Sequence, residues 1–157
     1  MLTAQLREFK PSDKNFIFSA WLRSYQQQFP KDCPKEIFYS RQHAVIEYLL
    51  GKSKVLVVSD MIDPDHLFGF MVYENHDDCS ILHYLFVKEA FKGLKVGKKL
   101  YDTLKEPVFY THRTGQGIRF LEKTTKVRVF NPWLIFEDFK WEQSSPSPIS
   151  PKKEPTP

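Results

Sequence analysis

Residues 87–100 read VKEAFKGLKVGKKL and lead from a hydrophobic strand, through two glycines, into an amphipathic helix. At such a junction the first N–H groups of the helix lack partners inside it, and the helix dipole adds about half a positive charge. Gly93 and Gly97 allow a ligand to approach the main chain closely. Four lysines raise the local positive potential, namely Lys92, Lys95, Lys98 and Lys99. The stretch therefore predicts a turn that binds an anion such as a pyrophosphate.

The common nucleotide-binding motifs do not explain this turn. The sequence contains neither GxxxxGK[ST], the P-loop pattern, nor GxGxxG, the dinucleotide pattern. A strand, a glycine turn and a basic helix also occur together in proteins with no such ligand. The turn alone therefore does not decide the function.

Upstream of the turn, the spacing of apolar residues predicts a strand at 4–9 and two helices. Ser12 is the expected N-cap of the first helix, which Pro30 to Pro34 ends. The second helix is expected over 35–50, with Gly51 as its stop. Its expected core residues are Ile37 or Phe38, Tyr39, Val45, Ile46 and Leu49.

Three strands should then form an antiparallel meander, at 55–58, 67–73 and 80–87. After the turn we expect a helix over 97–105, a strand at 108–111, a short helix over 118–123 and an extended segment at 127–136. An aromatic-rich end is expected to complete the core, and could instead shape a pocket or a dimer contact: Trp133, Phe136, Phe139 and Trp141. The order of elements predicts an α+β fold.

The composition fits one domain followed by a tail. The chain has 157 residues, of which 41% are hydrophobic and 15% aromatic, enough for one compact core. Residues 144–157 read SSPSPISPKKEPTP and contain too little apolar surface to offset their ordering entropy. We therefore expect a domain at 1–143 and a disordered tail at 144–157, although proline-rich tails can also dock in aromatic grooves.

Charge and cysteine content exclude several classes of partner. The net charge of +4 is small and scattered, so nucleic acid is not an expected partner. Cys33 and Cys79 lack the spacing of a metal site or a disulfide framework. No apolar run approaches the roughly 18 residues of a membrane span. We expect a cytoplasmic protein without metal.

The turn resembles motif A of the GNAT acetyltransferase superfamily, commonly written V-x-P-x-Y-R-G-x-G-I-G-x-x-L. Four residues match outright, namely Val87, Gly93, Gly97 and Leu100, and three are close physical replacements, namely Phe91, Lys92 and Val96. Glu89 and Lys95 depart from the motif. The element order over 4–136 is also similar to the GNAT arrangement, with a mixed, mostly antiparallel sheet and helices on both faces. The segments WLRSY at 21–25 and ILHYLFVK at 81–88 are similar to segments of small GNAT-like proteins of tailed bacteriophages. That resemblance would place the chain in a host cytoplasm.

The resemblance implies direct transfer of an acetyl group from acetyl-CoA to an acceptor amine. Phe86 and Val87 would bind pantetheine through the main chain of the cofactor strand, beside a splayed fifth strand. The residues that would bind the rest of the cofactor are Lys92, Gly93, Leu94, Lys95, Val96, Gly97 and Lys98. The acceptor, a small molecule or a protein, is not specified, and either a monomer or a homodimer fits.

Three residues are candidates for the proton transfers. His83, on the cofactor strand, has the intrinsic pKa of a general base, but it could equally be a strand residue bonded to a neighbour. Glu89 could serve instead, directly or through water. The family's usual tyrosine after the fifth strand is missing, so Tyr110 or Thr111 is the candidate near the leaving thiolate, and His112 and Arg113 could line the acceptor pocket. A non-catalytic binding or virion-assembly module with the same fold is the alternative function.

Overall fold

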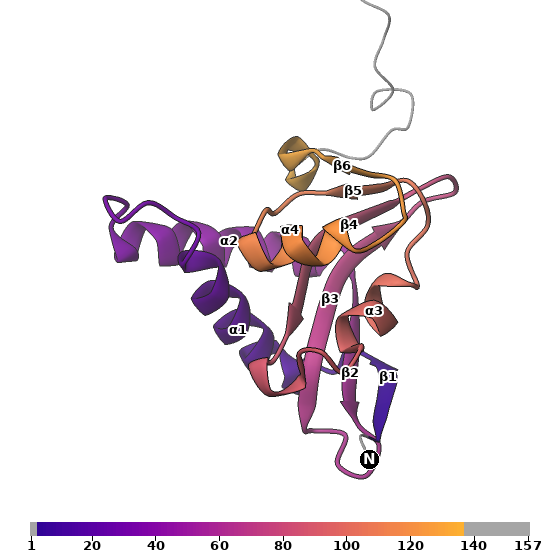
Figure 1. Ribbon diagram of the computed structural model, residues 1–157. Helices are drawn as coiled ribbons and strands as arrows, with labels where there is room; N and C mark the ends of the chain where they lie inside the picture. Colours follow the sequence, from indigo (N-terminus) through magenta and orange to yellow (C-terminus); the bar gives the residue numbers. More distant parts are fainter. Residues whose placement is uncertain (1–2, 137–157) are drawn as a thin grey trace, which may run out of the picture.

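The computed structural model describes residues 3–136 of the chain (Figure 1). Over this range the chain forms a six-stranded sheet with helices against both faces. The predicted α+β fold is thereby confirmed. The expected tail at 144–157, the domain boundary at 143, and the aromatic residues Phe139 and Trp141 lie outside the described residues.

The strands follow one another across the sheet in chain order. They are β1 (Ala4–Glu8), β2 (Lys54–Asp60), β3 (Leu67–Asn75), β4 (Ser80–Val87), β5 (Val108–Tyr110) and β6 (Arg128–Phe130). The first four pair antiparallel, and β5 and β6 join in parallel. The antiparallel pairing of β2 with β3 and of β3 with β4 confirms the predicted meander. It forms because each of these runs is apolar and separated from the next by a polar turn.

Two helices cover one face of the sheet, α1 (Lys14–Gln26) and α2 (Lys35–Lys52). Their buried side chains pack on those of β2, β3 and β4, and the main contributors are Ile17, Trp21, Ile46, Leu49, Val57, Phe70, Val72 and Tyr84. Of the two alternatives at the start of α2, Phe38 is buried and Ile37 is exposed. The predicted burial of Tyr39 is wrong, because its ring lies at the surface with its hydroxyl donating to Gln26.

Two shorter helices cover the other face, α3 (Val96–Tyr101) and α4 (Gly115–Glu122). They pack over the alternate side chains of the same strands, and the shared core contains Val58, Phe68, Met71, Leu82, Val96, Leu100, Tyr101 and Leu121. This arrangement places the start of α3 just beyond the carboxyl end of β4, with α4 beside it.

Two predicted helix boundaries are wrong. Ser12 is not an N-cap, because residues Pro11–Asp13 form a 3-10 turn in which the Asp13 carboxylate accepts bonds from the Lys10 amide and from Arg7. Gly51 does not stop α2, which continues to Lys52 and ends where the Ser53 amide bonds the Leu49 carbonyl.

The helix after the turn and the last extended segment are shorter than predicted. The chain leaves α3 after Tyr101 through tighter turns, and Lys126 donates to the Tyr101 and Leu104 carbonyls there. After β6, Pro132 lacks an amide donor and starts a 3-10 turn, Pro132–Ile135. Leu134 is buried, but Trp133 and Phe136 are 73% and 65% exposed, so core packing is wrong for these two aromatics.

Candidate active site

The anion turn has two residues in the left-handed backbone region. After β4 the chain makes a 3-10 turn, Glu89–Phe91, and Gly93 and Lys95 then have φ of 80° and 62°. Glycine adopts this conformation without strain, whereas a lysine there costs roughly 1–2 kcal/mol. The reversal lets α3 start directly at Val96, beside the end of β4.

The turn presents main-chain amides without partners. The amides of Lys92 and Leu94 donate to the carbonyls of Glu89 and Phe91. Five amides of the turn have no acceptor within residues 3–136, and they belong to Gly93, Lys95, Val96, Gly97 and Lys98. Such a group of unpaired N–H donors at the positive end of a helix is suited to an anion.

The side chains of the turn differ in their availability. Lys92 bonds both Glu89 and Gln116 of α4, each at 2.6 Å, and Lys98 pairs with Asp102. Leu94 is half exposed, whereas Val96 is buried in the core and can offer a ligand only its main chain. A Cβ at Gly97 would lie 3.2 Å from the Phe120 ring, so this glycine is also needed for the packing of α4 on α3.

A fork between β4 and β5 lies upstream of the turn. The two strands pair only through Ser80–Leu82 of β4 and Val108–Tyr110 of β5, after which the Thr111 amide bonds the Leu82 carbonyl. His83 is the extra residue of a β-bulge, since Leu82 pairs with Tyr73 and Tyr84 with Val72. In the described structure, the rest of β4 therefore has no β5 partner on that edge.

Phe86 and Val87 lie on this unpaired part of β4. The Phe86 ring packs against Phe16 and Phe70, so its main chain rather than its ring is available to a ligand. On the opposite edge, β3 approaches closely at Gly69, where an added Cβ would lie only 2.5 Å from the Phe86 carbonyl oxygen.

A chain of hydrogen-bonded polar side chains, four of them buried and Glu74 partly buried, crosses the fork. His83 Nε2 lies 2.6 Å from Glu74 Oε2, and His83 Nδ1 lies 2.9 Å from Thr111 Oγ1. Thr111 Oγ1 lies 2.9 Å from His112 Nδ1, and His112 Nε2 lies 3.1 Å from Gln42 Nε2. The five residues come from β3, β4, the end of β5 and α2, so the chain joins both sides of the fork.

Burial keeps His83 and His112, the two histidines of this hydrogen-bonded chain, neutral. It lowers the pKa of His83 by more than the Glu74 carboxylate raises it. It also lowers the pKa of His112 to about 3, with a further contribution from His83. Burial raises the pKa of Glu74, but the bond from His83 and the nearby Lys52 outweigh it, so the pKa of Glu74 is lowered and its carboxylate is ionised.

The structure brings only one of the three candidate catalytic residues to the fork. His83 is fully buried there with both ring nitrogens bonded, so its part in proton transfer stays a prediction. Glu89 lies beyond the end of β4, exposed and paired with Lys92. Tyr110 packs against Phe130 and the α3 side of the sheet. Its neighbour Thr111 is the residue that contacts His83.

Comparison with known proteins supports this architecture. Residues 15–122 match the model of the acetyltransferase (GNAT) family. The chain belongs to the GNAT acetyltransferase family. Among curated proteins, no relative matches it.

Solved GNAT-like structures share the fold at low sequence identity. A putative acetyl transferase from Pyrococcus furiosus aligns with a TM-score of 0.53 at 14% identity, over 98% of this chain and 99% of that one. A putative acetyltransferase from Pyrococcus horikoshii gives 0.52 at 15% identity, over 78% of this chain and 43% of that one. A GNAT acetyltransferase from Staphylococcus aureus gives 0.45 at 20% identity, over 64% and 63%. The chain thus spans less than two thirds of the last two proteins.

Two further observations concern metal sites and membrane spans. In residues 3–136 no cluster of three or more His, Cys, Asp or Glu side chains could hold a metal ion. None of the helices described there is long and apolar enough to cross a membrane.

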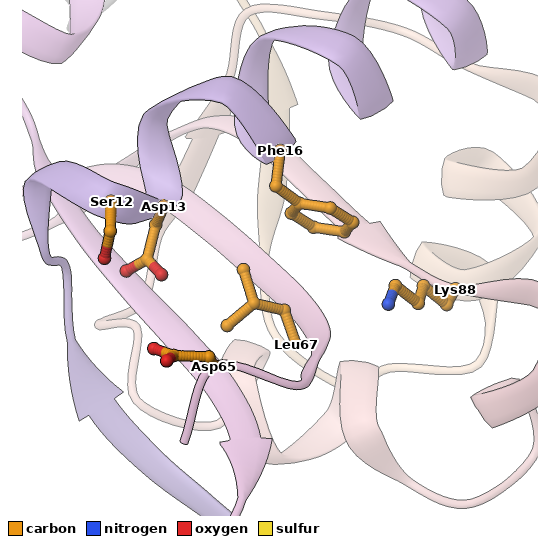
Figure 2. A pocket seen from close by; sticks show the side chains of 6 residues that line it. All are labelled: Ser12, Asp13, Phe16, Asp65, Leu67 and Lys88. Atoms are coloured by element: carbon orange, nitrogen blue, oxygen red, sulfur yellow. The ribbon is translucent and has the colours of Figure 1, made fainter. Parts of the chain in front are cut away.

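A cavity of about 180 Å³ lies between the start of α1 and the residue that follows β4 (Figure 2). Ser12 and Asp13 line it from the 3-10 turn before α1 and Phe16 from α1 itself; Asp65 lines it from the β2–β3 connection, Leu67 from the start of β3, and Lys88 from just after β4. Lys88 Nζ lies over the Phe16 ring, 5.0 Å from its centroid, and Arg7 already engages the Asp13 carboxylate. Of the charged groups at this cavity, the Asp13 carboxylate is therefore already paired within the fold.

Proposed function

We propose that this GNAT protein is an N-acetyltransferase that binds acetyl-CoA at residues 92–98 and moves its acetyl group directly to an amine. The observation that carries the proposal is the set of five unpaired amides, at Gly93 and at Lys95 through Lys98. Family membership supports the choice of ligand, because acetyl-CoA carries a pyrophosphate.

Three parts of the cofactor would each have a matching part of the chain. The pyrophosphate would accept bonds from the unpaired amides, while Lys92, Lys95 and Lys98 add positive charge. Pantetheine would bond the main chain of Phe86 and Val87 along the free edge of β4. The thioester would then lie at the fork, next to the His83 bulge.

Direct transfer needs little dedicated chemistry. The amine nitrogen forms a bond to the thioester carbon, the C–S bond breaks, and the thiolate takes a proton that the nitrogen loses. Orientation of the two reactants accounts for much of the rate gain, and a main-chain N–H at the carbonyl oxygen would stabilise the intermediate. The acceptor is an amine of a small molecule or a protein.

Calorimetric titration with acetyl-CoA tests this function. Wild type should bind, and Gly93→Val should lose at least tenfold in affinity, because a side chain would cover the amides in a backbone conformation that valine resists. Gly51→Val is the matched control, since Cβ atoms at Gly51 and at Gly93 both meet open space. Absence of binding by wild type would favour the non-catalytic binding or assembly module instead.

A further inference from the structure

The polar chain at the fork has a single direction. The Glu74 carboxylate only accepts, so His83 Nε2 carries the hydrogen and neutral His83 accepts at Nδ1. Thr111 must therefore donate its hydroxyl hydrogen to His83 and accept from His112 Nδ1. His112 Nε2 is left as an acceptor, and Gln42 Nε2, which can only donate, lies beside it. Each bond is thus fixed by the one before it.

The charged groups around His83 fit this direction. Glu74 faces it from β3, Lys52 of α2 lies 3.7 Å from the same carboxylate, and His76 lies 3.5 Å from the other oxygen. From the end of β5, His112 faces His83 through Thr111. An imidazolium formed at His83 would therefore lie against an ionised carboxylate.

Among the hydrogen-bonded residues of the polar chain, Thr111 is the one that lies where β4 and β5 separate. Its amide makes the last bond to β4, and the two strands diverge beyond it. Its hydroxyl donates one bond and accepts one, which leaves one oxygen lone pair for a further donor.

We propose that Thr111 and His83 together accept the proton that the acceptor amine must lose, with the partly buried Glu74 as the counter-charge. The inference rests on the proposed function. The ammonium of the acceptor gives one proton to Thr111 Oγ1 while the Thr111 hydroxyl hydrogen moves to His83 Nδ1. The free amine attacks, its second proton leaves with the CoA thiolate, and the proton on His83 returns to solvent by the same hydroxyl.

The tautomers are tested by long-range ¹H–¹⁵N NMR of the full chain labelled at histidine, without any cofactor. At neutral pH, His83 should be the neutral Nε2–H form and His112 the neutral Nδ1–H form. His83→Gln and His112→Gln assign the two sets of signals. A protonated His83, or the opposite tautomer at either ring, would overturn the inference.

The proton transfer is tested with two small amines and acetyl-CoA, by release of the CoA thiol. Methylamine is protonated at neutral pH and needs a base, whereas hydroxylamine is already unprotonated. Thr111→Val should slow the methylamine reaction about a hundredfold, the lower end of general base effects, and the hydroxylamine reaction less than tenfold. Thr111→Ser, which keeps the hydroxyl, should restore the methylamine rate to within a few fold.

Other outcomes separate the two proposals. Equal losses of Thr111→Val with both amines, or no loss, would overturn the role of Thr111. Wild-type protein that uses hydroxylamine but not methylamine would also overturn the role of Thr111. Reaction with neither amine despite the predicted tautomers would count against the transferase function, and with it the relay.

Discussion

The two buried histidines at the fork make the folding free energy depend on pH. In the unfolded chain both histidines have the ordinary pKa of 6.5, but burial lowers the pKa of His112 in the folded chain to about 3. Acid therefore favours the unfolded chain. The folded chain keeps its full stability only at pH values above the pKa of these histidines in the unfolded chain. His112 alone should cost about 2 kcal/mol between about pH 7 and about pH 5, and His83, whose pKa is also lowered, acts in the same direction.

Urea denaturation at the two pH values measures this dependence. His112→Gln should reduce the loss by about 2 kcal/mol. His43→Gln, at an exposed residue of α2, should leave the loss unchanged. Equal pH dependence in wild type and His112→Gln would mean that His112 is protonated in the folded chain.

The left-handed backbone at Lys95 predicts a stabilising substitution. Lys95→Gly removes a strain of roughly 1–2 kcal/mol, offset by about 0.5–1 kcal/mol for the more flexible unfolded chain. The free energy of unfolding should rise by up to about 1.5 kcal/mol in urea melts. Lys92→Gly is the control, because φ at Lys92 is −65°, so no backbone strain is removed there, and the entropic cost adds to the loss of the bonds to Glu89 and Gln116. A gain at both positions would refute the backbone explanation.

At the level of elements, β3 depends on one close approach to β4. Gly69→Ala places a methyl group 2.5 Å from the Phe86 carbonyl oxygen, and main chain cannot move aside as a side chain can. We expect a loss of about 1–3 kcal/mol in the free energy of unfolding, as for other overpacked sites. Gly51→Ala, whose added methyl meets open space, should be neutral or slightly stabilising. An effect of Gly69→Ala no larger than that of Gly51→Ala would contradict this account.

Elements defined by local pattern could be predicted from the sequence, and those defined by distant contacts could not. The bounds of β4 were predictable because residues 81–87 are apolar or aromatic, apart from His83, and lie between polar turns. The helical stop at Gly51 was not, since packing of Leu49 and the bond from Ser53 carry α2 two residues further, to Lys52. The parallel joining of β5 and β6 depends on three-residue strands, too short to show a period.

At the scale of the molecule, the candidate site combines a local and a non-local part. The anion turn lies within one stretch of sequence, so its glycines and lysines could be recognised together. Glu74 and Gln42 could not, because they reach His83 and His112 only through the β3–β4 register and the packing of α2. A bulge at His83, which has no sequence signal here, completes the fork.

Acetyl-CoA should stabilise the whole domain while protecting only the site. A ligand at a hundred times its dissociation constant adds about 2.7 kcal/mol, which corresponds to roughly 5–10 °C in melting temperature for a chain of this size. Hydrogen exchange should slow at the five unpaired amides, from Gly93 to Lys98, because the cofactor would give them acceptors. It should also slow along the free edge of β4 at Phe86 and Val87, and remain unchanged in β1. Protection confined to the cavity beside Lys88 would place the ligand elsewhere, since none of residues 92–98 lines that cavity.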